Sequence, residues 1–449
     1  MLTLAFALPA AACGGFFCSP AIAPIDQAAE EIVFAYDEEQ GLVEMHIEIT
    51  YDGQSDDFAW VLPVPAEPEL FLSSNDMFAQ LSAATAPTFT TNLVQEGRCA
   101  RPVRLGCASF EASLSGGVAQ DGIYVVDEER IGPYDTVTLQ AESADALLTW
   151  LTDNNYDLPS EIEPLLEVYI SATSHFVAMR LAADQDTGDI EPIAMRYPAS
   201  GMAIPIQLTA IAAAADMPLR VYVFADERAV PESYLSVEIN EAAIDWVGGG
   251  SNYYEVVEAA ANEADGHAFV TEFAGKSDVA ADFGSDSLLI ELVSRYPYLT
   301  RMTAVLSPDE MTVDPTFVLN KMLPDVAKDH VADMIVDCSG GKKQENAPMH
   351  IRLADGREIH HGKGLSQSGE TRKSVADLQD VPAMAILDLS VADGEEIAHF
   401  SNDAEESLDS HNRPHTQGGC GCSTAPIPNS IFGLAALAFL VRRRRTRRA

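Results

Sequence analysis

Apolar and polar positions alternate along the first part of the chain in a pattern typical of strands. Residues 42–51 alternate cleanly, and apolar runs at 32–36 and 58–65 lie beyond the turn residues Gly41 and Gly53. These three segments predict an antiparallel meander. Within residues 42–51, His46 shares the polar positions with two glutamates, so we expect its side chain to face water.

The same reasoning extends to about residue 320. Strands are expected on both sides of Gly132-Pro133, at 175–181 and 190–197 with a hairpin turn between them, and at 219–224. Ser307 followed by Pro308 is typical of a helix start. Further helices are predicted at residues 75–84, 143–153, 252–264 and 286–295. We therefore predict an α+β fold, mainly antiparallel sheet with a few packed helices.

Beyond residue 334 the apolar runs become shorter. Two similar segments, 353–360 and 391–399, each contain an Asp-Gly hairpin signature, and they predict either a small β module or two similar turns. We expect an α+β domain over 13–334, a β-hairpin-rich segment over 335–400 and a disordered acidic stalk over 401–419.

Both ends of the chain resemble targeting segments. Residues 1–12 are uncharged, mostly apolar and end in small residues, which predicts a signal peptide cleaved before Cys13. Acylation of Cys13 is an open alternative, although Ala10 stands where a lipoprotein signal prefers leucine.

At the other end, a hydrophobic helix is expected at about 427–441. Its uninterrupted apolar run, 431–441, rises only about 16 Å, against a hydrocarbon core of roughly 30 Å, so it is a marginal membrane span. The arginines that follow are expected to stay in the cytoplasm and leave the rest of the chain outside: Arg442, Arg443, Arg444 and Arg445.

Composition narrows the possible partners. The chain has 449 residues, 47% of them hydrophobic, which is typical of a globular protein. With 69 acidic against 27 basic side chains its formal charge is −42, and a field of that sign repels nucleic acid. We therefore expect no nucleic-acid partner.

We interpret the seven cysteines on the expectation that the protein is exported. Disulfides persist in oxidising compartments, and closeness in sequence predicts two short-loop pairs, Cys13 with Cys18 and Cys99 with Cys107. Cys338 is then left over. It could be free, paired with Cys420 or Cys422, or bridged to another chain.

Motifs for catalysis are missing from the sequence. It contains no His-Glu-x-x-His, no Gly-x-Ser-x-Gly and no Gly-x-Gly-x-x-Gly after a strand. Asp184, Asp186 and Asp189 could hold calcium, although a plain turn is the favoured interpretation. Four histidines in the C-terminal hairpins could meet to bind zinc or copper, with solvated positions favoured: His350, His360, His361 and His399. We expect no catalytic residue and no cofactor other than a possible calcium ion.

Two parts of the chain resemble known families. Blocks at 12–18, 57–65, 218–224, 268–273 and 306–315 resemble an uncharacterised bacterial exported family, domain of unknown function 2330, over about residues 12–320. The family carries no activity to transfer. The tail, 418–449, resembles the myxobacterial-type C-terminal sorting signal, which implies cleavage and attachment near Cys420 or Cys422 by envelope sorting and processing machinery.

These observations predict an exported protein anchored at the cell surface or outer envelope, with a non-enzymatic binding or structural role. The C-terminal helix would contact the membrane at least transiently. The alternatives are an extracellular hydrolase with a site assembled from distant residues, and a metal-binding surface module.

Overall fold

The computed structural model describes residues 26–52, 59–99, 130–154, 156, 162–170, 175–182, 190–264, 266–281, 284–339, 347–361, 384–390 and 395–399. Statements about structure concern these residues. The described residues contain six α-helices and four β-sheets, most of whose strand pairs are antiparallel. The predicted α+β class is confirmed in this respect.

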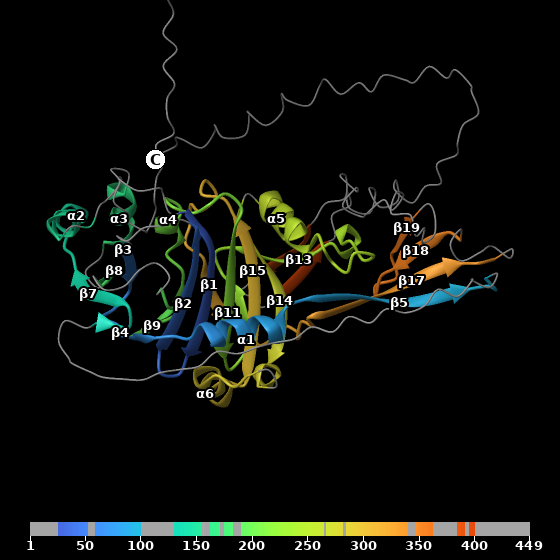
Figure 1. The fold of residues 1–449 in the computed structure, drawn as a ribbon, viewed down its shortest axis with the longest axis horizontal. Helices are drawn as coiled ribbons and strands as arrows, with labels where there is room; N and C mark the ends of the chain where they lie inside the picture. Colours follow the sequence, from blue (N-terminus) through green and yellow to red (C-terminus); the bar gives the residue numbers. More distant parts are fainter. Residues whose placement is uncertain are drawn as a thin grey trace, which may run out of the picture. The chain divides into compact units, whose positions relative to one another are not determined.

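A ten-stranded mixed sheet is the centre of the fold (Figure 1). Its pairs β1–β11 and β13–β14 are parallel, and its other pairs are antiparallel. In spatial order its strands are β21 (Glu395–His399), β20 (Met384–Ser390), β13 (Leu235–Ile239), β14 (Ala268–Lys276), β15 (Tyr298–Leu306), β11 (Met217–Ala225), β1 (Asp26–Asp37), β2 (Leu42–Asp52), β9 (Ile193–Pro198) and β4 (Glu69–Leu72).

The remaining described strands form three smaller sheets. One has the order β3 (Ala59–Val64), β8 (His175–Leu181), β7 (Tyr134–Gln140) and β6 (Arg130–Ile131). A second has the order β10 (Met202–Ala203), β16 (Thr316–Leu319) and β12 (Ala229–Pro231). The third has the order β19 (Glu358–His361), β18 (Met349–Arg352), β17 (Asp329–Asp337) and β5 (Thr88–Glu96).

The two faces of the central sheet pack against different partners. On one face, Ile32 and Val221 share a core with Leu62 and Val177 of the β3–β8 sheet. Successive residues of a strand point to opposite sides of the sheet, so the same strands also present side chains to the other face. Helices pack against the side chains on that face. These are α1 (Asn75–Thr85) and α6 (Ser287–Arg295) near β1 and β11, and α5 (Tyr253–Glu263) near β13 and β14.

The β3–β8 sheet has a helical cover of its own. Val61 and Phe176 pack against α2 (Ala144–Asp153) and α3 (Glu163–Tyr169). A short helix, α4 (Ile206–Thr209), contributes Leu208 to the same cluster. Two 3₁₀ turns, η2 (Glu241–Ala243) and η3 (Ser277–Ala280), connect elements of the central sheet.

Three local predictions are wrong. The expected meander ends after its second strand, because β3 pairs with β8 in a separate sheet rather than with β2. The segment after Ser307 forms a turn rather than a helix: the Ser307 N–H donates to Glu310 Oε2 at 2.7 Å and the Glu310 N–H donates to the Ser307 carbonyl at 2.9 Å. These are the contacts of a helix cap, but the chain continues into β16 instead. The strands β8 and β9 form no hairpin, since β8 pairs with β3 and β7 while β9 pairs with β2 and β4.

The C-terminal hairpins join different sheets. β18 and β19 form the first around Gly356, whose φ of +90° is readily adopted by glycine. β20 and β21 form the second, and β20 pairs with β13 at the edge of the central sheet. β17 runs through the expected boundary at residue 334, so the described strands show two hairpins in separate sheets rather than one module.

Several predictions lie outside the described residues: the signal peptide 1–12, the stalk 401–419 and the sorting tail 420–449. Among the residues that are described, no helix has the length and apolar character to cross a bilayer.

A buried acid on β1 leads to a prediction about pH. Glu30 is 4% exposed, and burial raises its pKa from 4.5 to about 7 although Gln27 Nε2 donates a hydrogen bond to it at 3.0 Å. The folded state then holds this proton more tightly than the unfolded state, so the free energy of unfolding should fall as pH rises from about 4.5 to 7. The uncharged Glu30→Gln variant should gain about 3 kcal/mol of stability over the parent at pH 8.

Urea titrations of both proteins at pH 5 and pH 8 measure this difference. The exposed Glu39 on the β1–β2 turn provides the matched control, since Glu39→Gln removes a charge that is already in water. The raised pKa of Glu30 would be contradicted if the stability of Glu30→Gln relative to the parent were no greater at pH 8 than at pH 5.

Candidate functional site

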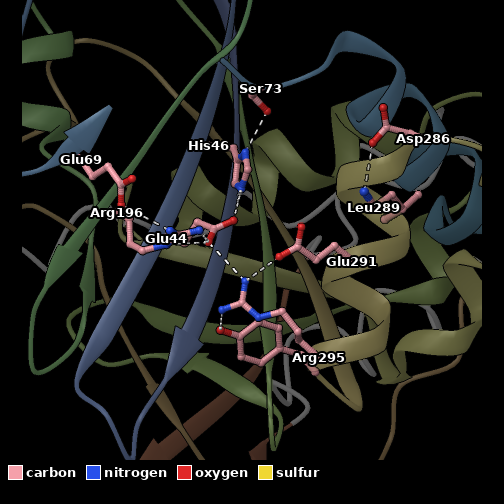
Figure 2. Close-up of polar contacts among 10 residues, drawn as sticks. Glu44, His46, Glu69, Ser73, Arg196, Asp286, Leu289, Glu291 and Arg295 are labelled. Carbon is pink, nitrogen blue, oxygen red and sulfur yellow. Dashed lines mark hydrogen bonds and ion pairs between the residues drawn. The ribbon is translucent and has the colours of Figure 1, made fainter. Parts of the chain in front are cut away.

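His46 belongs to a polar network on the helix-covered face of the central sheet (Figure 2). It lies opposite Val33 of β1, a residue that packs against α1 and α6. Its side chain is 0% exposed, so the expectation that it faces water is wrong. The polar face of β2 is covered by α1 and α6, which lie outside β2 in the sequence, so the alternation within β2 could not indicate this cover.

The imidazole joins an acid to a hydroxyl. Its Nε2 lies 3.1 Å from Glu44 Oε1, and its Nδ1 lies 2.9 Å from Ser73 Oγ. An ionised carboxylate can only accept hydrogen bonds, so in the neutral ring Nε2 carries the proton and Nδ1 accepts from the Ser73 hydroxyl. Ser73 is half-buried and directly precedes Ser74, the N-cap of α1.

Two arginines hold the acid as an anion. Arg196 of β9, directly across from Glu44, donates to Glu44 Oε2 from Nη2 at 2.7 Å and from Nε at 3.1 Å. Arg295 Nη1, from α6, lies 3.5 Å from the same oxygen. Burial alone would raise the pKa of Glu44, but hydrogen bonds and charge from His46 and Arg196 outweigh it and lower the pKa to about 2.

The network reaches both helices. Arg295 also pairs with Glu291 one turn earlier in α6, at 3.3 Å. Ser74 Oγ donates to Asp286 Oδ2 at 2.7 Å, and Asp286 caps α6 by accepting the Leu289 N–H at 3.0 Å. The two helix starts are therefore linked to each other as well as to the sheet.

This arrangement permits two roles. A serine, a histidine and a carboxylate in series form a proton relay that can activate a hydroxyl nucleophile. In this relay Glu44 shares its charge among His46 and two arginines, which reduces its ability to stabilise an imidazolium. The same contacts fasten α1, α6 and β9 to β2, and this structural role uses every contact observed.

The low pKa of Glu44 predicts acid sensitivity. A carboxyl whose pKa is about 2 when folded and 4.5 when free stabilises the fold fully above pH 4.5, and the contribution is lost as pH falls toward 2. Glu44→Gln should therefore cost about 3 kcal/mol at pH 7 and much less near pH 2.

Guanidinium titrations of parent and variant between pH 2 and 7 measure that difference. Glu69→Gln is the control: Glu69 also pairs with Arg196, at 3.4 Å, but its side chain is 72% exposed. Its substitution should change stability by less than about 1 kcal/mol. Equal costs for the two variants at pH 7 would contradict the assignment.

A second buried network lies further along the same face. Arg301 of β15 forms an ion pair with Glu272 of β14, and both side chains are 0% exposed. The Tyr253 hydroxyl of α5 donates to Glu272 Oε1 at 2.8 Å. Arg301 also donates to Thr85 Oγ1 of α1 at 3.2 Å, so this pair connects two helices to the sheet.

The disulfide prediction needs correction. Cys99 is bonded to Cys338, 239 residues away, rather than to Cys107. Cys99 follows β5 and Cys338 follows β17, and these strands pair in parallel up to Glu96 and Asp337. Sequence proximity favoured Cys107 as the partner of Cys99, whereas the parallel pairing of β5 and β17 brings the C-terminal ends of these two strands together. Cys13, Cys18, Cys107, Cys420 and Cys422 lie outside the described residues.

The metal candidates find little support. Asp184, Asp186 and Asp189 lie outside the described residues, as do Arg442 to Arg445. His350 and His360 are cross-strand neighbours with ring centroids 5.4 Å apart. His361 follows on β19, whereas His399 is on β21 of the central sheet. The described part of the chain contains no group of three or more histidine, cysteine, aspartate or glutamate side chains placed to hold a metal ion.

Comparison with known proteins identifies the family. The profile of an uncharacterised protein conserved in bacteria, domain of unknown function 2330, matches residues 8–318. The chain belongs to this family. The resemblance over about residues 12–320 is thereby confirmed, and it brings no assigned activity.

Other comparisons add little. No curated protein matches the chain. Among solved structures, the chain is similar to the crystal structure of baculovirus P35, with 11% sequence identity, coverage of 49% of this chain and 68% of that chain, and a TM-score of 0.24.

Proposed function

We propose that this family member is an exported bacterial envelope protein with a non-enzymatic binding or structural role, retained at the cell surface through its C-terminal segment. The bond between Cys99 and Cys338 is the observation that carries the proposal, because such a bond persists in an oxidising compartment outside the cytoplasm. The apolar start of the chain and its tail of a hydrophobic run before arginines support the same location.

The polar networks favour a role without catalysis. The His46 and Arg301 clusters join helices to the central sheet through ion pairs and hydrogen bonds, as expected for groups that stabilise a fold. The strong negative charge further favours cationic partners over anionic ones.

Fractionation of native cells tests this function. Intact mass, surface proteolysis and thiol labelling should detect a surface-accessible, oxidised protein without the residues after Cys420 or Cys422. A form that keeps the arginine tail in the inner membrane would contradict surface retention. A reduced form confined to the cytoplasm would overturn export.

A second candidate function rests on a specific contact. Ser73, His46 and Glu44 are placed in series, as in a hydrolase that uses a serine nucleophile. If this relay is catalytic, a fluorophosphonate probe should label Ser73 in the folded protein, and Ser73→Ala should abolish the labelling. Ser82→Ala on α1 is the matched control. Absence of labelling at Ser73 would remove this candidate.

A further inference from the structure

A cavity of about 310 Å³ lies where the β3–β8 sheet meets the central sheet. Met45 of β2 and Tyr197 of β9 come from the central sheet, Pro63 comes from β3, and Pro65 directly follows that strand. Tyr169, the last residue of α3, and Asp314 before β16 add polar groups to the lining. The volume is at the lower end of the usual range for ligand pockets, which suits a small molecule.

Asp314 is the acidic group in this largely apolar lining. Its Oδ1 accepts the Tyr169 hydroxyl at 2.8 Å and the Gln207 N–H at 3.1 Å, both from neutral donors. Burial raises the pKa of Asp314, although these hydrogen bonds act in the opposite direction. Across the described residues Asp314 makes no ion pair with a basic side chain. Among the described residues, the Asp314 carboxyl is therefore held by neutral hydrogen-bond donors and not by a basic side chain.

The lining combines an acidic group with apolar side chains, and it therefore suits a cation that also has an apolar part. An ammonium group next to Asp314 would gain charge attraction in a partly desolvated site, and Tyr169 and Tyr197 are aromatic residues of the same lining, of the kind that can add cation–π attraction. The apolar remainder would pack on the prolines and Met45. The charge of −42 on the whole chain raises the local concentration of cations further.

We infer that this pocket binds a small amphiphilic amine, with its ammonium group on Asp314 and its apolar part against Pro63 and Tyr197. This inference rests on the proposed role as a binding protein and names the class of ligand. Ligand binding is measured on the purified chain, and export is measured in cells. Separate experiments therefore distinguish the failure of this inference from the failure of the proposed export.

Calorimetric titration of the purified protein tests the inference with three probes of similar shape. Phenethylamine should bind at least about tenfold more tightly than neutral 2-phenylethanol, and anionic 3-phenylpropanoate should bind least. Equal affinity for the amine and the alcohol would overturn the role of charge. No heat of binding with the amine at millimolar concentration would overturn the site.

Variants locate the binding site. Asp314→Asn removes the charge but keeps an oxygen that can accept from Tyr169 and Gln207, so it should weaken amine binding at least about tenfold and leave alcohol binding unchanged. Ala203→Phe, at a lining position on the short strand β10, should weaken the binding of both probes. Exposed Asp309→Asn is the charge-matched control. Full amine affinity in folded Asp314→Asn, checked by thermal unfolding, would refute the assignment.

Discussion

Replacing Arg301 with methionine is expected to lower the free energy of unfolding by about 3–5 kcal/mol, because the change leaves the buried Glu272 carboxylate without its charge partner. Both side chains are fully removed from solvent, so water cannot replace the lost contact. Urea titration at pH 7 with circular dichroism measures the change. Glu272→Gln should produce a loss of similar size for the reciprocal reason.

The position of the pair explains why the effect should be large. Arg301 lies over the Tyr222 ring, 5.6 Å from its centroid, and donates from Nη1 to the Ser82 carbonyl and Thr85 Oγ1 of α1 at 3.2 Å each. Glu272 accepts the Tyr253 hydroxyl of α5. Removing the guanidinium therefore removes two contacts to α1. It also leaves α5 hydrogen-bonded to a Glu272 carboxylate that has lost its charge partner.

The double variant separates pairing from packing. Arg301→Met with Glu272→Gln leaves neither partner charged, so its cost should be clearly smaller than the sum of the two single costs. Additive costs would contradict a direct interaction. Arg180→Met is the surface control: Arg180 lies 3.9 Å from Asp135 with both side chains about half exposed, and the change should cost less than about 1 kcal/mol.

Removing the disulfide is the second large effect we expect. Cys99→Ala should lower the free energy of unfolding by about 2–5 kcal/mol, because the bond closes a chain segment of 239 residues in the unfolded state. The two Cα atoms are 4.8 Å apart, and Cys338 is 0% exposed within a small core with Val336 and Met349. Denaturant titration of oxidised parent and variant measures the loss.

Reduction provides an independent control for this experiment. A reductant should destabilise the parent to about the level of Cys99→Ala and should have a smaller effect on the variant. Peptide mapping without reduction should recover a linked fragment that contains Cys99 and Cys338. Recovery of Cys99 linked to Cys107 would contradict the structure and restore the prediction from sequence proximity.

The sequence predicted the elements that depend on local patterns. The four helices expected from capping and periodicity are found as α1, α2, α5 and α6, and three of them begin after side-chain caps, Ser74, Ser143 and Asp286. Strand β1 is found at the predicted apolar run, and strands β2 and β11 are found where strands were predicted at 42–51 and 219–224. The short helices α3 and α4 were not predicted, because α3 has seven residues and α4 four, too few to show a period.

The candidate site could not be predicted in the same way. His46 occupies a polar position of β2, and that pattern is the same whether water or a helix covers the strand. Ser73 is brought to it through β4, which pairs with β9, and Arg295 is brought from α6 almost 250 residues away. Buried charged residues such as Arg301 likewise resemble exposed ones in a sequence, since their partners are remote.

By itself, the sequence determined the α+β class, the main strands and helices and the bacterial family, because each depends on residues close together or on a run of matching positions. Tertiary structure decided what covers each strand and which distant groups meet. It placed β8 and β9 in separate sheets, joined Cys99 to Cys338 through the parallel strands β5 and β17, and buried His46 beneath two helices. The physical reason is that pairing and burial are set by strand order across the whole fold, and local hydrophobic patterns do not encode that order.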